Sequence, residues 1–258
     1  MDIIDDHERA LGMRRGCHVW SNPGSPQKPR RYGVVFPAAK RARQQTGATL
    51  CKKLIVVLVL TMPLIFDPLI GFARPPEVLA FGDSLTAGLG LTDRQAFPAQ
   101  LEARLRQQGI ELHIVNAGVS GDTTTDGLAR LDWALAGKPD FVILELGAND
   151  ALRGIDPKIV RNNLNAMIGR IQASGAKVLL IGMAAPANWG PDYQHAFDAI
   201  YPDLAKAHGV PLYPFFLEGV AMNPDLNQPD GIHPNERGVA ILVDHIAPLV
   251  AKLVEGKS

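Results

Sequence analysis

From Glu77 to the C-terminus, short apolar runs alternate with longer stretches of helical periodicity, and this alternation constrains the fold more than any other feature. The apolar runs predict five buried strands, at 78–81, 112–116, 141–145, 177–182 and 210–213. The stretches between and after them predict helices at 97–107, 126–136, 157–174, 193–207 and 234–253. Because strands that alternate with helices form parallel sheets, the sequence predicts an α/β fold with helices on both faces of a five-stranded sheet.

Two residues are expected to define helix ends. Gly209 follows the fourth predicted helix and can take the left-handed conformation that ends many helices. Pro234 is predicted as the first residue of the last helix, because its fixed φ and its missing N–H suit that position.

Polar, glycine-rich segments follow the first three predicted strands, and a fourth lies beyond the fifth strand. In open parallel sheets, ligands bind outside the carboxyl ends of the strands, so these segments should converge on one edge. The four segments are Gly82-Asp83-Ser84-Leu85, Asn116-Ala117-Gly118-Val119-Ser120-Gly121-Asp122, Gly147-Ala148-Asn149-Asp150 and Asp230-Gly231-Ile232-His233-Pro234. Their residue types point to nucleophilic acyl transfer.

Ser84 is the candidate nucleophile, with His233 as its base and Asp230 as the acid partner of the histidine. A serine hydroxyl is a weak nucleophile that needs an adjacent base. The histidine in turn needs a carboxylate that fixes its tautomer and stabilises the imidazolium. Asp230 and His233 are three residues apart across Gly231, so one tight turn can bring the carboxylate and the imidazole together.

The same segments offer hydrogen-bond donors for the oxyanion of a tetrahedral intermediate. Gly118 offers a backbone N–H that no side chain blocks, Asn149 offers its side-chain amide, and Ser84 offers its own N–H. Taken one at a time, each of these residues is more typical of a turn or a helix cap than of an active site. Their order along the chain, each after the expected strand, favours the functional interpretation.

The segment 185–190 follows the fourth predicted strand and should border the same crevice. We expect Asn188 and Trp189 in this segment to contribute to substrate binding, at the site of the acyl group. The alternative is an ordinary turn in which Trp189 covers the core.

The four segments resemble the sequence blocks of the SGNH, or GDSL, hydrolase family. The blocks are Gly82-Asp83-Ser84-Leu85, Gly118, Gly147-x-Asn149-Asp150 and Asp230-x-x-His233, and the resemblance runs from about residue 78 to the last helix. Further stretches, among them Ser120-Gly121-Asp122-Thr123 and Gly127-Leu128-Ala129-Arg130-Leu131, resemble the bacterial periplasmic thioesterases, lysophospholipases and arylesterases of that family. One departure is Ala148, where that branch has a second glycine.

The resemblance implies a flavodoxin-like, three-layer α/β sandwich with strand order 2-1-3-4-5. It also implies Ser84 as nucleophile, an oxyanion hole of Ser84, Gly118 and Asn149, and a mechanism that uses no cofactor and no metal. The implied substrates are small acyl esters and thioesters, with transient contact with lipid substrates, and we expect a monomer. A carbohydrate O-deacetylase of the same family is the alternative.

Composition argues against several other classes of protein. From residue 74 onward there is no cysteine, which excludes a disulfide framework, a thiolate zinc site and a cysteine nucleophile in this part. The same part carries 15 Lys and Arg against 21 Asp and Glu, so we expect no nucleic-acid partner. A two-metal phosphoesterase needs several His and Asp ligands, yet only His233 lies in a candidate motif. A flavin carrier is disfavoured because Asp83 puts negative charge where a phosphate would bind.

The first 73 residues differ in character from the rest of the chain. Residues 1–53 carry 11 Lys and Arg against 4 Asp and Glu, and we interpret 1–49 as disordered or as an artefact of start-site choice. Residues 50–73 join two lysines to an apolar run and a small residue, which is the pattern of a signal peptide, with an uncleaved membrane anchor as the alternative. Residues 74–258 then form the hydrolase domain, which we expect in the periplasm or outside the cell.

Overall fold

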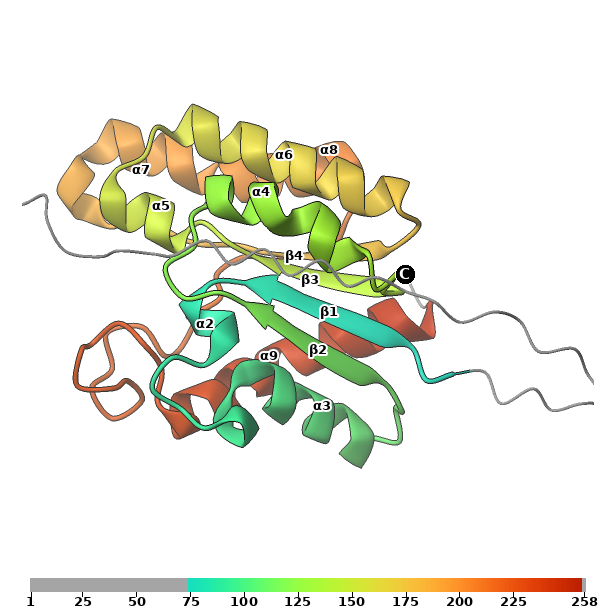
Figure 1. Ribbon diagram of the computed structural model, residues 1–258. Coiled ribbons are helices and arrows are strands. Elements are labelled where there is room, and N and C mark those ends of the chain that lie inside the picture. The colour runs from blue at the N-terminus through green and yellow to red at the C-terminus, as the bar shows by residue number, and fades with distance from the viewer. Residues whose placement is uncertain (1–73, 257–258) are drawn as a thin grey trace, which may run out of the picture. The chain divides into compact units, whose positions relative to one another are not determined.

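Five parallel strands form one sheet in the order β2-β1-β3-β4-β5 in the computed structural model, which describes residues 74–256 (Figure 1). The expectations for 1–49 and 50–73 lie outside the described residues. The strand order is the one implied by the resemblance, so the predicted fold class is confirmed. The strands are β1 Glu77–Gly82, β2 His113–Gly118, β3 Phe141–Glu145, β4 Lys177–Ile181 and β5 Leu212–Tyr213.

The register of the central strands brings their carboxyl ends to one level. Gly82 at the end of β1 pairs with Gly118 at the end of β2 and with Glu145 at the end of β3. The segments that follow these strands therefore start side by side at one edge of the sheet, as the sequence predicts.

Helices cover both faces of the sheet, which makes three layers (Figure 1). One face carries α4, α5, α6, α7 and α8, and the other carries α3 and α9. The short helix α2 follows β1 directly at the carboxyl edge. The helices are α2 Ser84–Ala87, α3 Phe97–Gln107, α4 Thr124–Leu135, α5 Ala148–Arg153, α6 Pro157–Ala173, α7 Pro191–Asp198, α8 Ile200–His208 and α9 Glu236–Glu255, with 3-10 turns at Asp93–Gln95 and Ala187–Trp189.

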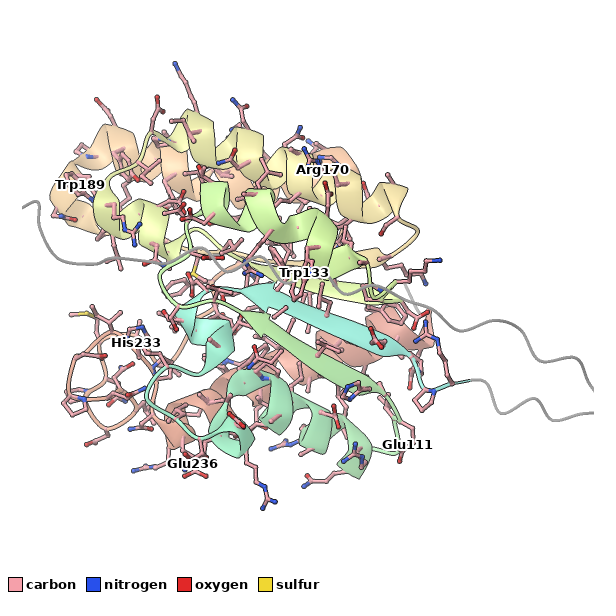
Figure 2. All side chains as sticks on the ribbon, in the orientation of Figure 1. Glu111, Trp133, Arg170, Trp189, His233 and Glu236 are labelled. Carbon is pink, nitrogen blue, oxygen red and sulfur yellow. The ribbon has the colours of Figure 1, made fainter. Side chains whose placement is uncertain are left out.

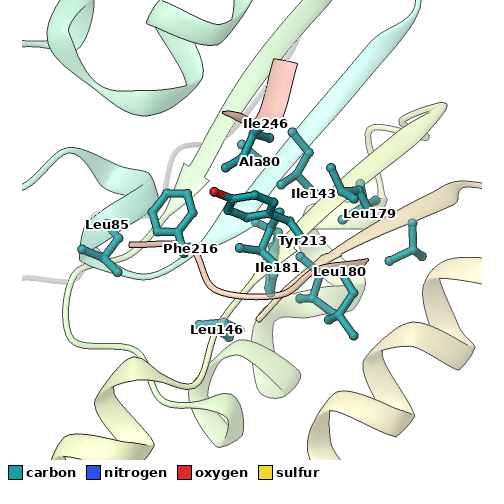
Figure 3. Packing of buried hydrophobic residues seen from close by; sticks show 14 of the residues in the cluster. Ala80, Leu85, Ile143, Leu146, Leu179, Leu180, Ile181, Tyr213, Phe216 and Ile246 are labelled. Atoms are coloured by element: carbon teal, nitrogen blue, oxygen red, sulfur yellow. The ribbon is translucent and has the colours of Figure 1, made fainter. Parts of the chain in front are cut away.

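The core lies between the sheet and its two helical layers. Helix α6 shows how the sequence builds it: Asp156 caps the helix by accepting a hydrogen bond from the Lys158 N–H, and Pro157 occupies the first helical position. Its buried residues recur at helical spacing: Val160, Leu164, Met167, Ile168 and Ile171. Near the carboxyl edge, Tyr213, Phe216, Ile181 and Leu146 belong to the same cluster (Figure 3).

Two predicted helices differ from the structure. The helix predicted at 193–207 is two helices, α7 and α8, which meet at Ala199. Pro202 lies in the first turn of α8 and has no N–H to donate to the Asp198 carbonyl four residues earlier, so one continuous helix is broken there. Pro234 is not the first helical residue, because Asn235 lies between it and α9. Asn235 caps the helix, since its side-chain oxygen accepts hydrogen bonds from the N–H groups of Arg237 and Gly238.

The short helices α2 and α5 are absent from the sequence-based prediction. Each is too short for apolar residues to repeat at helical spacing, so no pattern reveals it. None of the helices formed by residues 74–256 combines the length and the apolar character needed to span a bilayer.

Candidate active site

Ser84 is the first residue of α2, directly after β1. Asp83 caps this helix, since its Oδ1 accepts a hydrogen bond from the Leu85 N–H at 3.0 Å. The Ser84 Oγ lies 2.9 Å from His233 Nε2, and His233 Nδ1 lies 2.7 Å from Asp230 Oδ2. The structure thus brings the three residues named from the sequence into one continuous hydrogen-bonded chain.

The loop before α9 fixes the pair Asp230 and His233 through local contacts. Asp230 Oδ1 accepts hydrogen bonds from the N–H groups of Ile232 at 2.9 Å and His233 at 3.0 Å, and Gly231 supplies a φ of +71°. The backbone N–H groups of His233 and Ile232, followed by the His233 ring, lower the pKa of Asp230 to about 2. The carboxylate therefore stays ionised wherever a histidine can act as a base, and it holds Nδ1 of the ring protonated.

Asn149 lies in the first turn of α5, immediately after β3. Its Nδ2 donates to Asp83 Oδ2 at 3.2 Å and to the Asp122 carbonyl oxygen at 3.0 Å. Because both partners are acceptors, the NH₂ group of the Asn149 side chain, rather than its oxygen, faces Asp83, the residue before Ser84. The Ser84 N–H, as the first of a helix, has no intrahelical acceptor.

Gly118 does not reach the site in the way expected from the sequence. Its N–H donates to Asn116 Oδ1 at 3.0 Å, and it borders a separate groove beside Ala87 and Asn116 rather than the cavity of Ser84. A Cβ on Gly118 would lie 2.7 Å from Ala87 Cα and 2.8 Å from the Asp83 carbonyl oxygen. Gly118 therefore does not line the cavity of Ser84, and glycine is required at 118 because α2 packs against the end of β2.

Gly121, three residues after Gly118, lines the cavity in front of Ser84, where we expected Gly118. It has a φ of +89° in a turn closed by the Asp122 N–H and the Val119 carbonyl at 3.2 Å, and it lines the cavity with Ser84 and Asn149. Within residues 74–256 its N–H donates to no protein acceptor. The sequence contains a signal for Gly121, because this glycine comes directly before the polar residues at the start of α4. The signal does not decide between Gly118 and Gly121, since both lie close to the end of β2.

The cavity in front of Ser84 has a volume of about 500 Å³ and mostly apolar walls. The polar side chains that line it are few: Ser84, His233 and Asn149. The larger apolar side chains in its walls are Leu85, Leu89, Leu152, Met183, Phe215, Leu217, Met222 and Ile232. Such a site fits a ligand with one reactive polar group and an apolar tail.

Residues 80–241 match the model of the GDSL-like Lipase/Acylhydrolase family. The chain belongs to this family. It is 43% identical over 183 residues to Esterase TesA of Pseudomonas aeruginosa, covering 70% of this chain and 91% of that protein. It is 40% identical over 200 residues to Thioesterase 1/protease 1/lysophospholipase L1 of Escherichia coli K12, covering 76% and 95%. The crystal structure of AlinE4, an SGNH-hydrolase family esterase, is 48% identical with a TM-score of 0.60, covering 70% of this chain and 97% of that one.

In this GDSL-like hydrolase, two buried carboxyl groups lie behind the nucleophile. Asp83 is fully buried, and this burial raises its pKa to about 6. Glu145, also fully buried, accepts a hydrogen bond from Thr86 Oγ1 at 2.6 Å through Oε2. Its burial and then the nearby Asp83 charge hold the pKa of Glu145 well above its usual range. Both buried carboxyl groups beside the turn that carries Ser84 therefore have raised pKa values, because burial disfavours their charged forms.

Asn188 and Trp189, which we expected to contribute to substrate binding, do not line the cavity in front of Ser84. The segment 185–190 reaches the cavity through Ala185 and Pro186 instead. The Trp189 indole N–H donates to the Ala151 carbonyl at 2.8 Å. In Figure 2, Trp189 and His233 lie well apart in the structure.

The part of the chain that the structure describes holds no group of three or more His, Cys, Asp or Glu side chains arranged to bind a metal ion. The carboxyl groups nearest the nucleophile are engaged with the protein itself: Asp83 caps α2 and Glu145 accepts from Thr86.

Proposed function

We propose that this protein is a serine hydrolase that cleaves carboxylic esters and thioesters through an acyl-enzyme on Ser84. The observation that carries the proposal is the unbroken chain from Ser84 Oγ to His233 at 2.9 Å and on to Asp230 at 2.7 Å, beside a cavity with mostly apolar walls. Membership of a family of lipases and acylhydrolases supports the same reaction class.

In the first half of the reaction, Ser84 Oγ attacks the carbonyl carbon while His233 Nε2 accepts the hydroxyl proton. Asp230 stabilises the resulting imidazolium through Nδ1–H. The tetrahedral intermediate collapses as His233 returns the proton to the leaving alcohol or thiol, which departs and leaves the acyl group on Ser84. Water then attacks the acyl-enzyme with His233 as base, the carboxylic acid leaves, and Ser84 regains its proton.

The oxyanion hole proposed here consists of the N–H groups of Ser84 and Gly121 and the side-chain amide of Asn149. Ser84 and Asn149 are carried over from the sequence analysis, whereas Gly121 replaces Gly118 because it lines the cavity. In the free protein the Asn149 amide donates to Asp83 and Asp122. Catalytic hydrogen bonds often form only when the substrate arrives, so a developing oxyanion can draw one amide proton toward itself.

The apolar walls favour an acyl chain over a sugar, which needs many polar partners. Leu89, Leu152, Met222 and Ile232 line the cavity and are also strongly exposed, with between 47% and 91% of each residue accessible. An amphiphile that enters the cavity crosses these side chains, which supports transient contact with lipid substrates. The same feature disfavours the carbohydrate deacetylase alternative.

A substrate series tests the proposal directly. We expect turnover of nitrophenyl esters to depend on acyl chain length, with activity on an acyl thioester and little on a sugar acetate. Ser84→Ala should lower kcat on every substrate by about four to six orders of magnitude while the fold is retained. Wild-type turnover in Ser84→Ala would exclude the acyl-enzyme, and a preference for the sugar acetate would favour the deacetylase.

We further propose that the hydrolase domain acts as a monomer in the periplasm or outside the cell. The support is the basic and apolar pattern of residues 50–73, which is typical of signal peptides. N-terminal sequencing of the protein from its native host tests export. A mature terminus within a few residues of Arg74 supports cleavage, whereas an intact apolar run in the membrane fraction supports the anchor.

A further inference from the structure

One side chain outside the catalytic groups contacts several of the segments that carry them. Arg130, in α4, donates from Nε to Asp122 Oδ2 at 2.6 Å, from Nη1 to the Ala117 carbonyl at 2.9 Å and from Nη2 to the Gly82 carbonyl at 2.9 Å. Its guanidinium carbon also lies 4.0 Å from the centre of the Phe81 ring. All three nitrogens of the guanidinium group therefore have a protein acceptor, and the group is also stacked on an aromatic face.

Each acceptor belongs to a segment that carries a proposed oxyanion donor. Gly82 ends β1, two residues before Ser84. Ala117 and Asp122 lie on either side of the turn that contains Gly121. The Asp122 backbone carbonyl in turn accepts the hydrogen bond from Asn149 Nδ2 at 3.0 Å.

We propose that Arg130 is a positioning residue for the oxyanion hole, which holds the Ser84, Gly121 and Asn149 donors at fixed mutual distances. This inference rests on the function proposed above. Only a planar fork with several N–H donors can serve two carbonyls and a carboxylate at once, so lysine cannot replace arginine here. The ion pair with Asp122 is largely withdrawn from water, with 21% of the Arg130 and 11% of the Asp122 side chain exposed, so its hydrogen bond is stronger than a surface one.

The energetic reason for such a support is the steep dependence of catalysis on geometry. A displacement of about 1 Å in a preorganised site can lower the rate about 100-fold. The loop from Gly118 to Asp122 contains one turn hydrogen bond, between Val119 and Asp122. Arg130 adds contacts at both ends of that loop, and together with the Val119 N–H, which donates to the Gly82 carbonyl at 3.0 Å, it ties the loop to the end of β1.

The test compares Arg130→Lys with Arg161→Lys as a matched control. Arg161 forms an exposed ion pair with Asp203 at 2.9 Å on the helical surface, so its replacement should leave turnover unchanged. In Arg130→Lys we expect kcat to fall about 10- to 100-fold, with KM changed less than about threefold. The affinity for a tetrahedral boronic acid or phosphonate should fall in parallel with kcat/KM.

A double-mutant cycle separates positioning from a general structural role. If Arg130 acts through the oxyanion donors, Arg130→Lys should cost much less in an Asn149→Ala background than in the wild type. Full additivity, or a loss of thermal stability at unchanged kcat, overturns the proposal.

Asp122→Asn decides the question if Arg130→Lys does not fold. It keeps the backbone carbonyl that faces Asn149 and removes only the charge that Arg130 contacts. A smaller kcat loss that disappears in the Asn149→Ala background supports positioning, and an unchanged kcat overturns it. The proposed function fails in a different way, since ester turnover would then be absent from the wild type itself or equal in Ser84→Ala.

Discussion

The two sides of the catalytic cavity are built differently. The base side, Asp230 and His233, comes from one loop, and the hydrogen bonds that the Asp230 carboxylate accepts come from residues at most three positions away. The oxyanion side, Ser84, Gly121 and Asn149, comes from three segments that are distant in sequence. Its contacts join α2, the loop after β2 and α5 across 27 to 66 residues.

Burial follows the same division. The Asp230 side chain is 45% exposed, whereas Asp83 and Asp150 behind the oxyanion side are fully buried. Asp150 accepts hydrogen bonds from the Thr124 N–H at 2.8 Å and from its hydroxyl at 2.7 Å, which ties the start of α5 to the start of α4. The groups that must stay fixed while charge develops are therefore anchored in the core, and the proton-transfer pair lies in a loop near solvent.

The largest expected effect comes from the base side. His233→Ala should lower kcat by about four to six orders of magnitude, because Ser84 then has no group to accept its proton. The double variant with Ser84→Ala should be little worse than either single variant, since the two residues act as a unit. Steady-state kinetics with a nitrophenyl ester measure both, and multiplicative losses would show that the two residues act independently.

Removal of one oxyanion donor should have the next largest effect. Asn149→Ala should lower kcat about 100- to 1,000-fold, the range typical for loss of one preorganised donor. KM should change much less, because the charge that Asn149 stabilises exists mainly in the transition state. A variant with altered KM and normal kcat would instead make Asn149 a substrate-positioning residue.

The buried carboxyl of Asp83 should make stability depend on pH. Burial raises its pKa to about 6, so the folded protein binds this proton more tightly than the unfolded chain, where an aspartate titrates near 4. The contribution of Asp83 to the free energy of unfolding therefore falls as the pH rises from about 4 to about 6, by up to about 3 kcal/mol. Asp83→Asn removes this contribution.

Denaturant unfolding of the wild type and of Asp83→Asn between pH 4 and pH 8 isolates the contribution of Asp83 to the free energy of unfolding. The difference in unfolding free energy between wild type and Asp83→Asn should shift in favour of the variant over this interval. Asp230 serves as the internal contrast, because its pKa is lowered to about 2 and its titration lies below the interval. A difference that is constant with pH would mean that folding does not raise the pKa of Asp83.

The division between the two sides also decides what could be predicted from the sequence. Asp230 and His233 are three residues apart, so a single turn defines their relation and the sequence reveals it. Strong periodicity likewise predicts α3 at 97–107 and β3 at 141–145 with the observed bounds. By contrast, the choice between Gly118 and Gly121 depends on how α2 packs on β2.

Arg130 illustrates the same limit. Its partners are the carbonyls of Gly82 and Ala117, 48 and 13 residues away, and the Asp122 carboxylate 8 residues away. Backbone carbonyls have no sequence signature, so only the three-dimensional register of β1, β2 and α4 reveals this contact. Local chemistry is readable from the sequence, and long-range support for that chemistry is not.

The smallest expected effect separates the two glycines of the loop after β2. In Gly118→Ala the new methyl group would lie 2.8 Å from the Asp83 carbonyl oxygen and still closer to Ala87, so α2 must move, at a cost of about 1–3 kcal/mol. In Gly121→Ala the nearest atom is Arg153 Nη2 at 4.0 Å, so the cost is only the strain of an alanine at a φ of +89°, about 1 kcal/mol.

Thermal unfolding combined with kinetics then distinguishes a packing glycine from a cavity glycine. Gly118→Ala should lower Tm more than Gly121→Ala does, and it should lower kcat as well, because a shifted α2 carries Ser84 with it. Gly121→Ala keeps its N–H and its open surroundings, so kcat should fall only slightly. A Gly118→Ala variant with the Tm and kcat of the wild type would contradict the packing role of Gly118, because α2 would then tolerate the added methyl group without moving Ser84.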